Sequence, residues 1–206
     1  YAMIRKGETT RSGKVWEWDG APDGSEADDY HSARYERAAA FIGGLLQGVK
    51  AADPAAQTLV DTAGWLHYGF VDRLVKEDRV PFDILAWHWY SEMGDMTRVR
   101  GQLDLLAKLQ SYGKPIWITE INRRDGSKGG TEEEAASYLT ATAQQLRSHQ
   151  AVKAYFVYEL LDEPYFGPNG ESDYGLVKLS RENGAWKTGA RKPAFGALRK
   201  VIESTK

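Results

Sequence analysis

Short apolar segments alternate with helix-like segments over most of this 206-residue chain, and this alternation restricts its fold more than any other feature. The apolar segments are rich in Val, Ile, Leu and aromatic residues, as strands buried on both faces of a parallel sheet are. Strands are expected over residues 14–18, 57–62, 82–88, 115–120 and 152–160. The pattern predicts five βα units around a parallel sheet, in one domain over residues 1–206.

Helix signals fill the segments between these strands. Helices are expected over residues 28–52, 68–77, 97–112 and 131–149, and from 193 onward. The first should end before Asp53-Pro54, because the residue before a proline avoids the helical region. Thr131 and Glu134 have the spacing of a capping box, in which each side chain accepts a bond from the other's amide.

The number of strands is too small for a closed barrel. A (β/α)8 barrel has eight strands and typically about 250 residues, so about three strands are unaccounted for. The fold class expected is therefore α/β, a partial or reduced TIM-barrel-like fold. The missing N-terminal barrel strands could belong to a longer precursor or a separate chain. Alternatively, the N-terminal arm or a second copy in a homo-oligomer could cover the open edges.

Composition argues against several classes of partner. The 27 basic and 29 acidic residues nearly cancel, so the chain lacks the positive field that nucleic-acid binding requires. No apolar stretch reaches the roughly 20 residues of a membrane span. There is no cysteine, and the histidines are scattered without the spacing of metal ligands, so neither a metal nor a cofactor is expected.

The cellular compartment is open on this sequence. The first residues lack the apolar core of a signal peptide. The protein would be secreted or periplasmic if a signal has been removed, and cytoplasmic otherwise.

Glu120 is the best functional clue in the chain. It ends the run Lys-Pro-Ile-Trp-Ile-Thr-Glu at residues 114–120, an apolar strand that closes on a carboxylate. Barrel enzymes place their catalytic groups at the C-terminal ends of strands, so Glu120 is a candidate catalytic residue. The alternative is structural, because such a carboxylate could cap a helix or pair with Arg123 or Arg124.

Three motifs occur in a fixed order around Glu120. The first is the run ending in Glu120 itself, and the second is His88-Trp89-Tyr90 at the end of the preceding strand. The third combines residues 155–162 with Tyr-Gly-Leu at 174–176 and Lys-Pro-Ala-Phe at 192–195. In this order and spacing, residues 14–200 resemble the C-terminal five βα units of the clan A retaining glycoside hydrolases, closest to family 39.

The resemblance implies roles for several residues. Glu120 would be the nucleophile, with His88 and Tyr90 supporting it at the sugar site. The family's Asn-Glu pair, which holds a sugar hydroxyl and supplies the acid/base, would fall on Gly20-Ala21. The acid/base position is therefore an alanine here, and Asp19 is the candidate substitute. Retaining enzymes need two carboxylates about 5–5.5 Å apart, so the change at Ala21 predicts weak ordinary catalysis.

Sugar binding is expected from aromatic and polar residues near the strand ends. Sugar rings present apolar C–H faces that pack on aromatic planes, and the chain has 7 Trp and 11 Tyr. Trp87 and Trp89 could contribute, although about half of such residues should be core, and Trp117 is expected to face the helices. The substrate-binding candidates are Trp18, His88, Tyr90, Asn122, Tyr158 and Glu159.

Two functions from different classes fit these residues. The leading one is a retaining O-glycoside hydrolase of carbohydrate metabolism that cleaves β-linked sugars or oligosaccharides. The other is a catalytically impaired carbohydrate-binding or assembly module derived from such an enzyme. In both, the partner is a carbohydrate.

Overall fold

The structure is a computed structural model, and it describes residues 2–166 and 171–204. The chain divides into two compact units. The first comprises Tyr1–Ala86 and Leu105–Pro115, and the second comprises Trp87–Asp104 and Ile116–Lys206. The boundary between them runs through strand β2 (Ile84–Tyr90).

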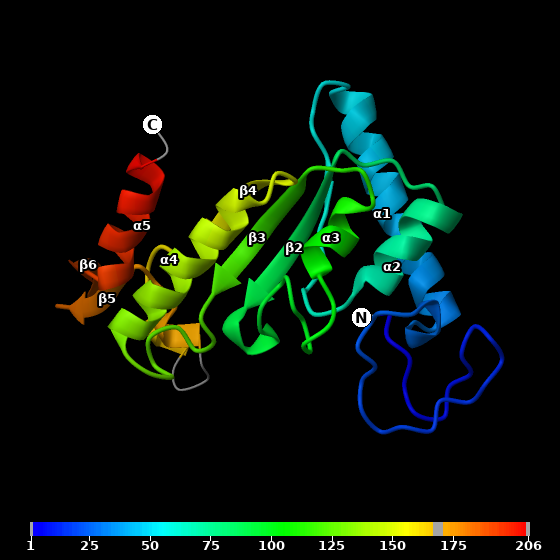
Figure 1. Cartoon of the computed structure of the whole chain (residues 1–206), viewed down its shortest axis with the longest axis horizontal. Coiled ribbons are helices and arrows are strands. Elements are labelled where there is room, and N and C mark those ends of the chain that lie inside the picture. Colours follow the sequence, from blue (N-terminus) through cyan, green and yellow to red (C-terminus); the bar gives the residue numbers. More distant parts are fainter. Residues whose placement is uncertain (1, 167–170, 205–206) are drawn as a thin grey trace. The chain divides into compact units, whose positions relative to one another are not determined.

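Four strands form the main sheet. They are β1 (Leu59–Val60), β2, β3 (Ile116–Asn122) and β4 (Val152–Val157), hydrogen-bonded in the order β1-β2-β3-β4. β2 and β3 are the two green arrows at the centre of Figure 1. In the first unit β1 is parallel to β2, with Leu59 opposite Ile84, and in the second unit β3 is parallel to β4, with Ile116 opposite Val152. Four of the predicted strands are therefore confirmed, as is the α/β class.

The strand predicted over residues 14–18 is wrong. Val15 forms an isolated antiparallel bridge with Thr9, and the chain turns between them at Gly13, whose φ is +87°. Val15 and Trp18 are 57% and 60% exposed, so this segment lacks the burial on both faces that a barrel strand has. It is one arm of an antiparallel loop in the first unit, and Gly20-Ala21 does not follow a barrel strand.

The helices of the first unit agree with the sequence except for one. α1 (Ser32–Ala52) ends before Asp53, as predicted, and α2 (Tyr68–Asp72) continues as a π-helical turn over Arg73–Glu77. α3 covers only Leu105–Gln110, whereas the prediction began at residue 97. The chain turns before it, where Arg100 and Gly101 have φ values of 51° and 78°.

Helices α4 (Glu132–Ser148) and α5 (Pro193–Glu203) pack together in the second unit. Thr131 and Glu134 form the predicted capping box. Tyr155 and Val157 of β4 pack against the small and branched residues between these helices, which are Ala136, Leu139, Ala143, Ala194, Leu198 and Val201.

The opposite face of β4 carries Phe156, since side chains alternate along a strand. The Phe156 ring contacts Trp117 of β3 at 5.8 Å and is 47% exposed. Because Trp117 contacts this ring, it does not face the helices as predicted.

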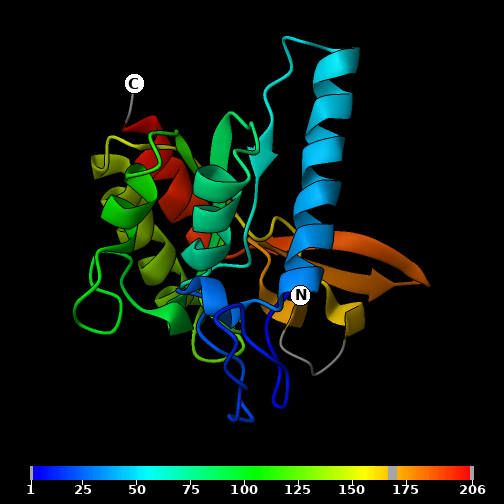
Figure 2. The ribbon, with the colours of Figure 1, turned by 90° about the vertical axis from the view of Figure 1, so that its right-hand side faces the viewer.

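A β-hairpin that was not predicted from the sequence precedes α5. β5 (Val177–Glu182) and β6 (Ala185–Arg191) are antiparallel (Figure 2). They are joined by Asn183-Gly184, with φ values of 50° and 81°. Two positive φ angles at Asn-Gly are typical of the type I′ turn, so the signal was present in the sequence.

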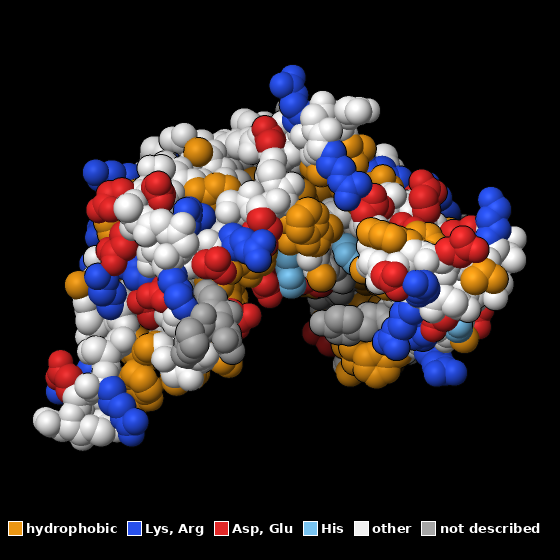
Figure 3. Space-filling model, turned by 90° about the horizontal axis from the view of Figure 1, so that it is seen from below, with side chains coloured by type: hydrophobic (Ala, Val, Ile, Leu, Met, Phe, Trp, Pro, Cys, Tyr) orange, Lys and Arg blue, Asp and Glu red, His pale blue; other side chains and the backbone are white. Residues whose placement is uncertain are grey.

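Two further features are the distribution of surface charge and the length and apolarity of the helices. Acidic and basic side chains are interspersed over the face shown in Figure 3. Across residues 2–166 and 171–204, no helix combines the length and apolarity of a membrane span.

Candidate active site around Glu120

Glu120 lies at an irregularity in the sheet. Ile118 is opposite Tyr155 and Ile121 is opposite Val157, so β3 advances three residues while β4 advances two. A bulge of this kind redirects a side chain, and bulges are common beside active sites. The Glu120 side chain is 34% exposed, which leaves its carboxylate open to a ligand.

Two residues of β2 reach the same oxygen of Glu120. The Tyr90 hydroxyl donates a 2.7 Å hydrogen bond to Oε2, and His88 Nδ1 lies 3.3 Å from Oε2. His88 and Tyr90 are two residues apart and therefore lie on one face of β2. The structure thus brings together the three residues expected at the centre of the site, although their roles stay predictions.

The Tyr90 phenol stays protonated and can donate its hydrogen bond to Glu120 permanently. Burial, together with its hydrogen bond to Glu120, raises the pKa of the Tyr90 phenol above its ordinary value. The phenol therefore keeps its proton over the working pH range and holds Oε2 as an acceptor. The Tyr90 hydroxyl and His88 Nδ1 therefore both lie beside Oε2 of Glu120.

Trp87 and Trp89, the alternate residues of β2, belong to the core. They are 0% and 1% exposed, so neither can stack on a sugar. The expectation that they could contribute to binding is wrong, and the reason is the alternation of faces along β2.

Tyr174 completes an aromatic group beside Glu120. Its ring meets Tyr90 edge-on at 5.8 Å and Tyr158 edge-on at 5.7 Å. The Tyr174 hydroxyl accepts a 2.9 Å hydrogen bond from the Asp125 amide, which fixes the ring from its far end. Tyr174 was not among the predicted site residues, although the Tyr-Gly-Leu motif contains it.

Asn122, which was predicted to bind substrate, is buried among protein partners, and that role stays a prediction. It is 1% exposed, and Nδ2 donates hydrogen bonds to the carbonyl oxygens of Tyr158 and Tyr174, the latter at 2.9 Å. Its Oδ1 accepts from the Arg123 amide at 2.7 Å. Asn122 is therefore a buried clamp that joins the end of β3 to the two segments carrying the aromatic rings.

Lys192 forms a second clamp between the same loops. It is 5% exposed, and Nζ donates to Asp162 Oδ1 at 2.6 Å, to Ser127 Oγ at 3.0 Å and to the Asp173 carbonyl at 3.0 Å. Its three protons are therefore all used. The loop after β3 is anchored through Ser127 to the segment that carries Tyr174.

Glu159 is the second carboxyl group of interest in this unit. Its Oε1 is buried without a hydrogen-bond partner among the described residues. Burial, reinforced by the nearby charges of Glu163 and Asp162, raises the pKa of Glu159 to about 7. A carboxyl group in this state can donate or accept near neutral pH, which suits contact with a sugar hydroxyl. Its role stays a prediction.

Asp19 and Trp18 lie in the first unit. The Asp19 side chain is 81% exposed and pairs with Lys6 at 2.9 Å. The Trp18 ring occupies the space that a Cβ at residue 20 would need, so this conformation requires Gly20. Without a strand over residues 14–18, Asp19 loses the strand-end position on which its predicted role depended.

Residues 19–21 nevertheless border a cavity of the first unit. Its volume is about 770 Å³, and its lining includes Asp61 and Thr62, which follow β1. Asp19 therefore stays a candidate acid, a role that awaits its test.

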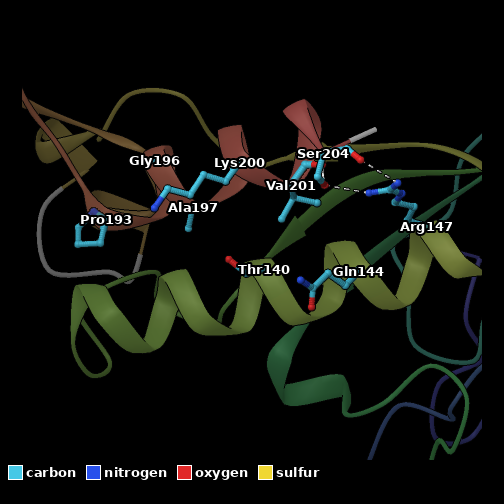
Figure 4. Close-up of a pocket in the computed structure, with 9 residues that line it drawn as sticks. All are labelled: Thr140, Gln144, Arg147, Pro193, Gly196, Ala197, Lys200, Val201 and Ser204. Carbon is cyan, nitrogen blue, oxygen red and sulfur yellow. Dashed lines mark hydrogen bonds between the residues drawn. The ribbon is translucent and has the colours of Figure 1, made fainter. Parts of the chain in front are cut away.

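Another hollow, of about 470 Å³, lies between α4 and α5 (Figure 4). Arg147 crosses its end and donates to Ser204 Oγ at 3.2 Å. Its lining residues include no carboxylate, so it lacks the groups for glycoside chemistry. Within the described parts of the chain, no group of three or more His, Cys, Asp or Glu side chains is arranged to hold a metal ion.

Solved structures with a similar fold are glycosidases. Xylanase 10B from Thermotoga maritima has a TM-score of 0.63 at 20% identity, over 91% of this chain and 59% of the xylanase. An endo-β-1,4-xylanase from Gloeophyllum trabeum has a TM-score of 0.57 at 15% identity, over 93% of this chain and 62% of that chain. A xylanase from Bispora sp. MEY-1 has a TM-score of 0.58 at 14% identity, over 81% and 53%.

These likenesses show the fold, that of part of a TIM barrel. The chain spans less than two thirds of the length of each of these three xylanases. No curated protein matches the sequence. The family described as "Glycosyl hydrolase catalytic core" matches residues 31–184, which is well over half of the chain and includes His88, Tyr90, Glu120 and Tyr174. The chain belongs to this glycosyl hydrolase catalytic core family.

Proposed function

We propose that this chain carries the nucleophile of a retaining glycoside hydrolase that acts on β-linked sugars or oligosaccharides. The observation that carries the proposal is the geometry at Glu120, where the Tyr90 hydroxyl donates to Oε2, His88 Nδ1 lies 3.3 Å from the same oxygen, and the Glu120 side chain is 34% exposed. Membership of the glycosyl hydrolase family gives the reaction class. We also propose that, among the clan A glycoside hydrolases, the chain is most similar to family 39.

The chemistry assigns Oε1 of Glu120 as the attacking atom. It forms a bond to the anomeric carbon, and the bond from that carbon to the leaving oxygen breaks, with the electron pair going to the leaving group. Water then attacks the anomeric carbon, the bond from that carbon to Glu120 breaks with its electron pair returning to the carboxylate, and the water gives a proton to the acid/base group or to solvent. Tyr90 contributes by fixing Oε2, because a carboxylate held at one oxygen presents the other in a single direction.

The leaving oxygen of a natural glycoside also needs a proton. Positioned acid/base catalysis contributes roughly 10²–10⁴-fold. Asp19, which lines the cavity beside Asp61 and Thr62, is the proposed donor. Leaving groups that depart without a proton test Glu120 independently of this assignment.

The test is hydrolysis of a panel of dinitrophenyl β-glycosides by the purified chain. We expect turnover that Glu120→Gln abolishes and that Glu133→Gln, an exposed residue at the start of α4, leaves unchanged. A 2-deoxy-2-fluoro dinitrophenyl glycoside should add one sugar to the peptide containing Glu120, as intact mass and peptide mapping would detect. Turnover that survives Glu120→Gln would refute the role of this residue.

Azide reports on the acid/base. Acceleration of wild-type turnover by azide would indicate that the base is missing, whereas its absence would support a substitute. Asp19→Asn should then slow natural oligosaccharides more than dinitrophenyl glycosides. Binding of oligosaccharides in calorimetry without turnover of any substrate would replace the proposal with a carbohydrate-binding module.

A further inference from the structure

An aromatic cluster lies exposed beside the β5–β6 hairpin. It consists of Tyr165 and Phe166, in the 3-10 turn Pro164–Phe166, and Trp186 of β6. The Tyr165 ring lies 5.1 Å from Phe166 and 5.7 Å from Trp186. The three side chains are 58%, 50% and 44% exposed, so they meet one another while their outer faces remain open to solvent.

The cluster lies on a segment that is hydrogen-bonded to the residues next to Tyr174. The Tyr165 hydroxyl donates a 2.7 Å hydrogen bond to Glu163, whose amide donates to the Ser172 carbonyl oxygen at 3.2 Å. Glu159 directly follows Tyr158, whose ring meets Tyr174. Tyr174 in turn meets the Tyr90 ring that holds Glu120. The cluster and the residues that hold Glu120 therefore belong to one compact unit, and backbone hydrogen bonds of Glu159 and Glu163 link them through residues 172–174.

The chemistry of the cluster suits a sugar chain. Exposed aromatic planes pack on the C–H faces of pyranose rings, while groups at their edges can bond hydroxyls. The Arg181 guanidinium lies 5.9 Å from the Trp186 ring centre, and Glu163 lies at the Tyr165 hydroxyl. Apolar planes bordered by charged hydrogen-bonding groups are thus present together.

A protein partner fits this surface less well. Stable protein interfaces bury roughly 800 Å² on each side, with an apolar centre. All seven residues of β6 are exposed, and Trp186 is the single large apolar side chain among them. The hairpin therefore presents an isolated aromatic cluster on a polar strand and lacks a broad apolar face.

We propose that Tyr165, Phe166 and Trp186 form a remote subsite that binds a β-linked oligosaccharide several sugar units away from Glu120. This inference deepens the proposed function and rests on it for the identity of the reacting end. It commits the substrate to an extended sugar chain that contacts both Glu120 and the cluster.

The test compares the kinetics of the wild type and Trp186→Ala on monoglycosides and on hexasaccharides. With dinitrophenyl monoglycosides, kcat/KM should equal that of the wild type, because the reacting sugar does not touch Trp186. With β-1,4-linked hexasaccharides of xylose and of glucose, KM should rise about fivefold with little change in kcat, since losing one such aromatic contact corresponds to about 1 kcal/mol. Tyr165→Ala should behave in the same way.

The matched control is Phe41→Ala, because Phe41 is an aromatic residue of α1 that is 73% exposed and lies in the first unit. It should leave both classes of substrate unchanged. Circular dichroism of each variant would establish that the fold is intact.

Binding to Glu120→Gln separates this proposal from the proposed function. Calorimetry should detect the hexasaccharides, and adding Trp186→Ala should weaken binding about fivefold. If the wild type turns over nothing yet this loss appears, the subsite is supported and the hydrolase proposal fails. If Trp186→Ala binds hexasaccharides as tightly as its parent, or if no hexasaccharide binds, the subsite is refuted. An equal loss on monoglycosides and hexasaccharides would also refute it.

Discussion

Replacing Lys192 by methionine should destabilise the protein strongly, and more so at high pH than at low pH. Lys192 is 5% exposed and Asp162 is 6% exposed, so both charges are removed from water. The methionine has a similar length but cannot donate to Asp162, Ser127 or the Asp173 carbonyl. Removing one partner of a buried ion pair typically costs about 3–5 kcal/mol, because the other charge stays buried without compensation.

The pH dependence follows from Asp162. Burial raises the pKa of its carboxyl group in the folded protein, and Lys192 opposes that rise. Without Lys192 the pKa should rise further above the unfolded value. The folded state then binds a proton more tightly than the unfolded state, so stability increases as the pH falls through the folded pKa. The deficit of Lys192→Met should therefore be largest at about pH 8 and smaller at about pH 5.

The assay is urea denaturation of the wild type and variant at both pH values, followed by tryptophan fluorescence. Lys178→Met is the matched control, since its 2.7 Å pair with Glu132 is 49% and 30% exposed. Such a surface pair contributes about 0–1 kcal/mol. A loss at Lys192 as small as that at Lys178, or a loss that does not change with pH, would refute the reasoning.

Three further predictions concern stability. Thr131→Ala removes the cap of α4 and should lower the free energy of unfolding by about 1 kcal/mol, measured by urea denaturation. Gly184→Val places a β-branched residue at a φ of +81°, which should cost at least about 1–2 kcal/mol and speed hydrogen exchange in β5 and β6. Glu159 has a pKa raised to about 7, so wild-type stability should fall as the pH rises from about 5 to 8. Glu159→Gln should reduce this pH dependence of the free energy of unfolding, measured by urea denaturation. A variant with the same pH dependence as the wild type would contradict the role of Glu159.

The elements that were predictable carry a complete local signal. β2 and β3 are continuous apolar runs, and burial on both faces requires such a composition. α4 opens on Thr131 and Glu134, whose reciprocal hydrogen bonds depend on a spacing of three residues alone. Where one stretch of sequence contains all the partners of an element, the sequence is sufficient to place it.

The strand expected over residues 14–18 failed for the opposite reason. Val15, Trp16 and Trp18 give residues 14–18 the composition of a buried strand, but the turn at Gly13 determines which segment pairs with them. That turn pairs the segment with residues 7–9 instead of a barrel neighbour. The same mistake displaced Gly20-Ala21 from the strand end where the family resemblance expected the acid/base.

The centre of the site was predictable, whereas its support was not. His88 and Tyr90 share one face of β2 by simple alternation, and Glu120 follows from the end of the next apolar run. Tyr174 lies 54 residues beyond Glu120, in the segment between β4 and β5, and its contact with Tyr90 depends on the path of that segment. A contact between loops depends on the path of both, and neither path is encoded by periodicity.

The buried polar residues explain how those loops are held. Asn122 bonds the carbonyl oxygens of Tyr158 and Tyr174, and Lys192 bonds Ser127 and the Asp173 carbonyl, so both clamps act on the backbone. Backbone groups in loops lack the partners that helices and strands provide, and burying them requires side-chain donors of this kind. Because these loops carry Tyr174, whose ring meets Tyr90, stability and the geometry at Glu120 depend on the same hydrogen bonds. Asn122, which the sequence suggested as a ligand for sugar, therefore affects the site through the position of Tyr174.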